Sequence, residues 1–220
     1  MTGEELHHLR NVNRAKNGDE LEVIDAKGSL YFGRIRDIDS REAAVEIVRR
    51  EYREKPPLRI IAAPSLTKKK NMSLMMEKLA ELGVDEIRPV IMTRTDEKYA
   101  PSMLKKWQRI AQQSLKVNKK LWPTEIYPPV RLDELLEDAA FTGTKLLLHA
   151  DGESRLPADI RCPVICLIGP PGDFVPEEVA RIREKGYLMV KINDSILKTE
   201  TAAVAGAAIL AFSLPAGVEG

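Results

Sequence analysis

The sequence predicts an α/β protein in which helices flank a parallel sheet, preceded by a small β-rich segment. Before Pro57, apolar and polar residues alternate in short runs, which is typical of half-buried strands. After Pro57, strand-like runs alternate with amphipathic helical ones, the order that builds a parallel sheet. Lys145–His149 and Val164–Ile168 are short and mostly apolar, as in strands covered on both faces. We therefore expect two domains, residues 1–57 and 58–220.

The first domain is expected to be a small β-barrel. Glu20–Ile24 alternates in polarity, and Ala26-Lys27-Gly28 offers a turn into a second strand at Leu30–Ile35. Ala43–Val48 supplies a third strand, and the pair Pro56-Pro57 ends the segment. A unit of about 55 residues lies near the lower limit for a stable core of its own.

In the second domain, the hydrophobic period switches repeatedly between that of a strand and that of a helix. One helix carries Met72, Met75, Met76, Leu79 and Leu82 on a single face, which we interpret as core packing, and it ends at Gly83. The other expected elements are, in order, a strand at Arg59–Ala63, a strand at Glu86–Met92 made irregular by Pro89, helices from Pro101 to about Lys120 and over Leu132–Ala140, the two apolar strands, a helix from Pro176 to Lys185, a strand at Leu188–Ile192 and a helix over Thr199–Leu214 with Thr199 as N-cap.

Composition points to a cytoplasmic protein without a membrane anchor or a metal. No apolar run reaches transmembrane length, and Met1–Glu5 lacks the basic and apolar regions of a signal peptide. The two cysteines, Cys162 and Cys166, are expected on one buried face of a strand. Neither a disulfide nor a zinc site is predicted, because the three histidines lie elsewhere in the sequence.

Basic residues are clustered although the net charge is only +1. Such clusters are usually solvated faces, so composition alone does not favour nucleic-acid binding over its absence. The clusters that we consider for RNA contact are Arg10, Arg14 and Lys16 near the N-terminus and the run Lys68, Lys69 and Lys70; a further group is Lys116, Lys119 and Lys120.

Three strand ends carry unusual loops, and ligands of open α/β sheets bind beyond the carboxyl ends of strands. These loops follow Leu148, Ile168 and Ile192. The second loop contains two glycines and two prolines but neither of the common nucleotide-binding fingerprints. Its rigid, bare backbone fits a flat ligand held by main-chain groups, but taken alone it favours a plain strand-to-helix turn. The helix after the third loop is rich in alanine and glycine, which indicates close packing against another backbone.

Several segments together resemble one family when they are taken in order along the chain. They are "HHLRNVNRAKNGDELEVIDAKGSLY" from His7, "KNMSLMMEKLAELGVDEIRPVIMTRT" from Lys70, "KKWQRIAQQS" from Lys105, "LIGPPGDFVPEEV" from Leu167 and "SILKTETAAVAGAAIL" from Ser195. This order resembles the bacterial 16S ribosomal RNA uridine-N3 methyltransferases, the RsmE family of the SPOUT superfamily. No single segment is specific, but their co-occurrence is.

The resemblance implies a PUA-like RNA-binding barrel followed by a trefoil-knotted SPOUT methyltransferase domain. It also implies a homodimer that takes S-adenosylmethionine as cofactor and ribosomal RNA, or the small ribosomal subunit, as substrate. Adenine is then expected to contact backbone groups and aliphatic side chains. The cofactor positions that follow from it are Leu148, His149, Ile168, Gly169, Pro170, Gly172, Ile192, Ile196, Leu197, Thr199 and Thr201.

The site loops depart from the family pattern while the scaffold segments keep it. Pro171 stands where the family usually has glutamate, Asp173 where it has glycine, and Lys198 where an arginine is common; Asn193 and Ser195 also differ. Methylating uridine N3 builds negative charge on the base, which a cation stabilises. We therefore take Lys198 and Arg94 as catalytic candidates, with Glu200 holding the loop that presents Lys198.

Two other functions remain open on the sequence. An RNA-binding protein of the same fold, with an altered target or without catalysis, would explain the substituted loops. A small-molecule α/β enzyme would make the basic clusters incidental. Affinity for S-adenosylmethionine separates the methyltransferase and the RNA-binding protein from the small-molecule enzyme. Methyl incorporation into RNA separates the methyltransferase from the RNA-binding protein.

Overall fold

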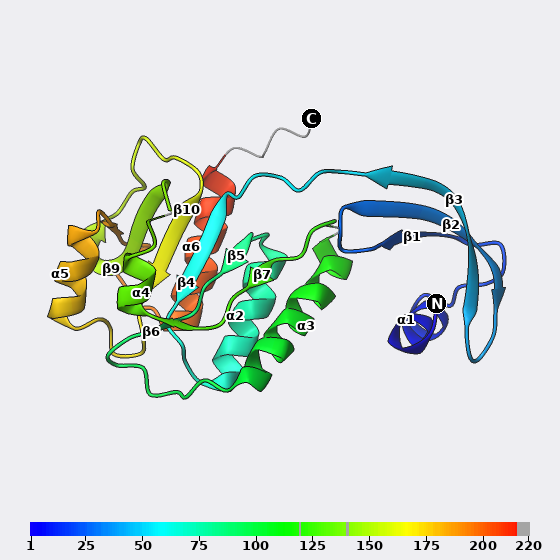
Figure 1. Cartoon of the computed structure of the whole chain (residues 1–220), viewed down its shortest axis with the longest axis horizontal. Coiled ribbons are helices and arrows are strands. Elements are labelled where there is room, and N and C mark those ends of the chain that lie inside the picture. Colours follow the sequence, from blue (N-terminus) through cyan, green and yellow to red (C-terminus); the bar gives the residue numbers. More distant parts are fainter. Residues whose placement is uncertain (119, 140, 215–220) are drawn as a thin grey trace. The chain divides into compact units, whose positions relative to one another are not determined.

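A computed structural model of the chain describes residues 1–118, 120–139 and 141–214 (Figure 1). The chain divides into two compact units. One consists of Met1–Lys55 with Lys120–Trp122, and the other of Pro56–Lys119 with Pro123–Gly220. Across the described ranges, no helix has both the length and the apolar character to cross a membrane. Lys119 and Ala140, expected near the ends of two helices, lie outside the described residues.

The first unit is a three-stranded antiparallel sheet in the order β1-β2-β3. Leu6 and Leu9 pack with Ile35 and Ala43 on its buried face. The expected barrel is thus an open sheet in the described residues, because three strands are too few to close one and N-terminal helical turns cover the face instead. The elements are α1 (Gly3–His7), a π-helical turn (His8–Val12), β1 (Glu20–Ile24), β2 (Ser29–Ile38) and β3 (Ala43–Tyr52).

A segment from far along the sequence completes this unit. The indole N–H of Trp122 donates to the carbonyl of Arg53 at 3.2 Å, and the N–H of Gly28 donates to the carbonyl of Leu121 at 3.2 Å. Gly28 has φ +93°, and a Cβ there would lie 2.7 Å from the Trp122 ring. Only glycine therefore fits this turn, for reasons of backbone conformation and of space.

The second unit contains a six-stranded sheet in the order β11-β9-β10-β4-β5-β7, paired in parallel throughout. The expected α/β class is therefore confirmed. Pro89 separates β5 from β6, which leaves the sheet and pairs with β8. The strands of the second unit are β4 (Ile60–Pro64), β5 (Glu86–Ile87), β6 (Val90–Ile91), β7 (Glu125–Ile126), β8 (Val130–Arg131), β9 (Thr144–Glu153), β10 (Val164–Ile168) and β11 (Leu188–Val190).

Helices cover both faces of this sheet (Figure 1). In β4, Ile60 and Ala62 contribute to a core shared with α2, α3 and α6, whereas Ile61 and Ala63 contribute to a second core with α4 and α5. Alternate residues of a strand point to opposite faces, so both faces must be apolar, as the sequence predicted. The helices are α2 (Lys69–Glu81), α3 (Pro101–Asn118), α4 (Leu132–Leu136), α5 (Pro176–Glu184) and α6 (Thr199–Ser213).

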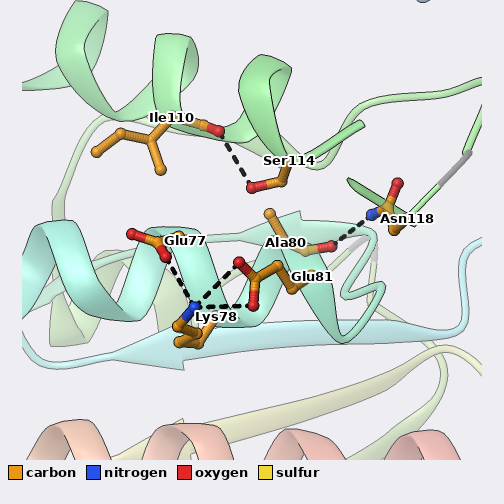
Figure 2. Close-up of polar contacts among 7 residues, drawn as sticks. All are labelled: Glu77, Lys78, Ala80, Glu81, Ile110, Ser114 and Asn118. Atoms are coloured by element: carbon orange, nitrogen blue, oxygen red, sulfur yellow. Dashed lines mark hydrogen bonds and ion pairs between the residues drawn. The ribbon is translucent and has the colours of Figure 1, made fainter. Parts of the chain in front are cut away.

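Helix α2 buries its methionine face and keeps a charged cluster on the other side. Met72, Met75 and Met76 are fully buried, which confirms their expected role in packing. Figure 2 shows the Lys78 ammonium between the carboxylates of Glu77 and Glu81, at 2.7 and 2.9 Å. These partners raise the pKa of Lys78. At the end of α3, the Asn118 amide donates to the carbonyl of Ala80 at 3.0 Å and joins the two helices.

The two cysteines do not share a buried face, and that prediction was wrong. Strand β10 begins only at Val164, so Cys162 precedes it and is exposed. Cys166 is buried within the strand, and burial raises the pKa of its thiol to about 12. In the described part of the chain, no group of three or more His, Cys, Asp or Glu side chains is arranged to hold a metal ion.

Candidate functional site

The carboxyl ends of the central strands are joined directly. The N–H of Ser65, just after β4, donates to the carbonyl of Ile168 at the end of β10, at 2.8 Å. The N–H of Leu66 donates to the carbonyl of Val90 in β6 at 2.7 Å. The loops that follow β4, β6 and β10 therefore start from one place, which is where open α/β sheets bind their ligands.

Thr199 connects two of the loops that the sequence singled out. Its hydroxyl donates to the carbonyl of Gly169 at 2.9 Å, and the residue is almost fully buried. Thr199 was predicted as the N-cap of the last helix, and this was wrong: Lys198 holds that position, without a side-chain cap. The hydroxyl is engaged at Gly169, so it is not available to cap the helix. The loops after β10 and before α6 are thus adjacent.

The loop after β10 is a tight turn with an exposed backbone. The N–H of Asp173 donates to the carbonyl of Pro170 at 2.9 Å, and both Gly172 and Asp173 have positive φ, at +86° and +67°. A Cβ at Gly169 would lie 2.7 Å from the buried Phe174 ring. Glycine at 169 therefore leaves room for the Phe174 ring against the loop.

Arg94 reaches this loop from the segment after β6. Its guanidinium donates to the carbonyl of Gly172 and, at 3.3 Å, to the carbonyl of Asp173. The side chain is exposed, so a cation stands at the rim of the loop. The sequence proposed Arg94 from its place in a family motif and from its charge; the structure brings it to the loop after β10.

Glu178 fixes the segment that carries Arg94, and sequence reasoning missed this role. Its carboxylate is 1% exposed and accepts the N–H of Thr93 at 2.7 Å and the N–H of Val175 at 3.2 Å. The sequence placed Glu178 only within the expected helix from Pro176 to Lys185. Nothing local signals that its partner lies 85 residues away.

His149 faces the same loop from β9. Its Nε2 lies 3.7 Å from a carboxylate oxygen of Asp173, and its Nδ1 accepts the N–H of Asp151 at 3.2 Å. The imidazole is 12% exposed and packs beside Phe174, with ring centroids 6.4 Å apart. Residue 149 was expected at the end of a strand, but β9 continues to Glu153 and places it within the strand.

A small pocket of about 100 Å³ lies between α6 and the sheet. Leu148 and Ile192, two of the expected cofactor positions, line it together with Gly206. A Cβ at Gly206 would lie 2.8 Å from the Leu148 side chain, so the small residues of α6 serve close packing on the sheet. The face of α6 that is left exposed carries Ile209 and Phe212, the latter 92% exposed.

The other candidates are brought together less closely. Lys198, Ile196 and Thr201 are exposed, Leu197 and Glu200 are partly buried, and Ile168 and Pro170 are buried. Ile196 is 97% exposed, although an aliphatic contact was expected of it. The residues considered for RNA contact, Arg10, Arg14, Lys16, Lys68, Lys69 and Lys70, are all exposed.

Comparison with known proteins decides the family. A profile described as an RNA methyltransferase domain matches residues 54–211, and one described as an RNA methyltransferase PUA domain matches residues 1–48. The ribosomal RNA small subunit methyltransferase E of Aquifex aeolicus is 32% identical over 212 residues, which cover 94% of this chain and 90% of that protein. The chain belongs to the ribosomal RNA small subunit methyltransferase E family.

Solved structures agree with this membership. A family member from Neisseria gonorrhoeae bound to S-adenosylmethionine is 27% identical with a TM-score of 0.82, covering 96% of this chain and 89% of that one. A methyltransferase of Legionella pneumophila in complex with the same cofactor is 28% identical with a TM-score of 0.81 and the same coverage. The family predicted from the motifs is confirmed, and with it an RNA methyltransferase activity that uses S-adenosylmethionine.

Proposed function

We propose that this protein transfers a methyl group from S-adenosylmethionine to N3 of a uridine in 16S ribosomal RNA. The observation that carries the proposal is the junction at Thr199, whose hydroxyl bonds the carbonyl of Gly169 at 2.9 Å. It joins the two loops that resemble the family's cofactor motifs, at the carboxyl edge of a parallel sheet. We further propose the SPOUT trefoil knot for residues 58–220 and a PUA-like RNA-binding role for residues 1–57.

The residues present fit this cofactor. The exposed turn at Gly172 offers main-chain groups to a flat adenine, and Leu148 and Ile192 offer aliphatic contact in the pocket between α6 and the sheet. Bound S-adenosylmethionine supplies a methyl group activated by a sulfonium. We therefore keep as proposed cofactor contacts Leu148, His149, Ile168, Gly169, Pro170, Gly172, Ile192, Ile196, Leu197, Thr199 and Thr201.

Two cations are proposed to act on the base. Negative charge develops on uridine as N3 loses its proton, and a positive group close by lowers the free energy of the transition state. Arg94 is held over the loop by two carbonyls. Lys198 precedes the first turn of α6, where the helix dipole adds positive potential, and Glu200 lies within that turn.

RNA binding and assembly complete the proposal. Arg10, Arg14 and Lys16 with Lys68 to Lys70 are exposed cations, suited to phosphate contacts. A homodimer is proposed through the exposed face of α6 at Ile209 and Phe212, because burying these two apolar side chains against a second copy would be favourable.

The test combines cofactor binding with methyl transfer. Calorimetry is expected to find one S-adenosylmethionine site per chain. Small-subunit RNA from a strain lacking this protein is expected to accept one methyl group, mapped by mass spectrometry to N3 of a uridine. Cofactor binding without transfer to RNA would favour a binding protein that has lost catalysis, and the absence of cofactor binding would contradict the proposal.

A further inference from the structure

The backbone of Asp173 adopts a conformation that few residue types take. Its φ of +67° lies in the left-handed region, which side chains other than those of Asp and Asn adopt reluctantly. The carboxylate is 52% exposed, so a ligand can reach it. An aspartate in this conformation, in the loop after β10, places its carboxylate in the candidate site.

Two neighbouring side chains face this residue from other elements. The imidazole Nε2 of His149, in β9, lies 3.7 Å from one carboxylate oxygen, and the N–H of Phe174 donates to the other at 2.9 Å. The Arg94 guanidinium, from the segment after β6, donates to the carbonyl of Asp173 itself at 3.3 Å. A proton acceptor on this loop and a cation from another segment are therefore neighbours.

Methylation at N3 removes a proton and builds negative charge on the base, so a proton acceptor and a cation both favour it. Asp173 is particular to this chain, since the family usually has glycine there, and this inference rests on the proposed function. We propose that Asp173 accepts the N3 proton of the target uridine, that Arg94 stabilises the charge on the base, and that His149 is a positioning residue for the Asp173 carboxylate. As the proton passes to Asp173, the N3 electron pair forms a bond to the methyl carbon. The carbon–sulfur bond breaks and its electrons stay on sulfur. Asp173 then releases the proton to solvent, so the products are N3-methyluridine, S-adenosylhomocysteine and one proton.

Other carboxylates near these loops are less suited to the role. Glu178 is buried and both its oxygens accept backbone N–H groups. Asp194 is bound to the Lys191 ammonium at 2.7 Å, and the side chain of Asp151 is 85% exposed beyond the loop. Within the described ranges, Asp173 combines access for a ligand, an imidazole partner and a neighbouring cation.

The decisive variants are Asp173→Asn and Asp173→Gly, measured in the full-length protein. Asparagine and glycine both tolerate the left-handed backbone, so the loop is expected to keep its shape while the proton acceptor is lost. The matched control is Glu177→Gln, which removes the same charge from an exposed position four residues away. Single-turnover methylation of unmodified small-subunit RNA gives the rate, and calorimetry gives the dissociation constant of S-adenosylmethionine.

Both Asp173 variants are expected to lower the methylation rate by about a hundredfold, the usual effect of losing a general base. Their cofactor affinity should stay within about threefold of wild type, which is less than 1 kcal/mol. The difference in methylation rate between wild type and the Asp173 variants should become smaller as pH rises, because more of the uridine then loses its N3 proton without a general base. His149→Ala should lower kcat with little change in the KM for RNA. His149→Gln, whose side-chain amide can approach the Asp173 carboxylate as a donor, should restore most of the rate.

The outcomes separate this inference from the proposed function. If the wild-type protein methylates N3 and Asp173→Asn does so at a rate within twofold of wild type, the role of Asp173 is overturned but the proposed function stands. The role of Asp173 is also overturned if Asp173→Gly keeps the wild-type rate while Asp173→Asn loses it. The asparagine side chain, and not the loss of the carboxylate, would then have lowered the rate. A wild-type protein that transfers no methyl group to uridine would overturn the proposed function and this inference together.

Discussion

Replacement of Glu178 tests how the site is held together. In the wild type, its carboxylate accepts the N–H groups of Thr93 and Val175 at 2.7 and 3.2 Å. Glu178→Ala leaves both donors without this partner, at about 1–2 kcal/mol each, so we expect the free energy of unfolding to fall by about 2–4 kcal/mol. Glu178→Gln keeps one acceptor oxygen but turns an amide N–H₂ toward the other donor, and should lose about 1–2 kcal/mol.

Urea unfolding followed by tryptophan fluorescence measures these losses. Trp107 is buried in α3 of the second unit, whereas Trp122 belongs to the first, so a Trp122→Phe background lets the signal report on the second unit alone. Glu177→Gln, on an exposed position of the same helix, should change stability by less than about 0.5 kcal/mol. If Glu178→Gln unfolds like Glu177→Gln, the buried carboxylate does not hold the Arg94 segment and the reasoning fails.

Three further predictions concern activity, RNA binding and assembly. Lys198→Ala should lower kcat by about a hundredfold with little effect on cofactor affinity, and Lys198→Arg should keep most of the rate; an unchanged Lys198→Ala rate would leave Arg94 as the acting cation. A triple alanine variant of Arg10, Arg14 and Lys16 should bind RNA more weakly with a shallower salt dependence, and an unaltered slope would exclude this cluster. Phe212→Asp should turn a dimer into a monomer by light scattering, and a wild-type monomer would refute the assembly.

Local patterns in the sequence were sufficient to predict most of the second unit. The apolar run of β10 and the methionine face of α2 were correctly predicted, because a strand or helix buried on a known face repeats its apolar residues with a fixed period. The first unit was predicted less well. Its N-terminal helical turns are short, and its closing segment at Trp122 comes from a distant part of the sequence that no local pattern connects to it.

The site was predictable as a set of loops but not as a set of contacts. The order of the motifs indicated one family and, from it, the roles of Gly169, Thr199 and Arg94. The structure brings the loops of Gly169 and Thr199 together. Thr199 was misjudged because a hydroxyl before a helix usually caps it, whereas here it bonds another loop. Glu178 and the Asp173–His149 pair could not be found, since their partners become neighbours only when the segments after β6 and β10 and strand β9 come together in the fold.

Mapping the methyl group on RNA tests the central claim most directly. Unmodified small-subunit RNA is incubated with the protein and isotopically labelled S-adenosylmethionine, and the RNA is then digested and analysed by mass spectrometry. We expect one label per RNA, on N3 of a uridine, with one S-adenosylhomocysteine formed for each label. A label on another atom would contradict the proposed substrate, and RNA without label, from protein that binds the cofactor, would contradict the proposed reaction.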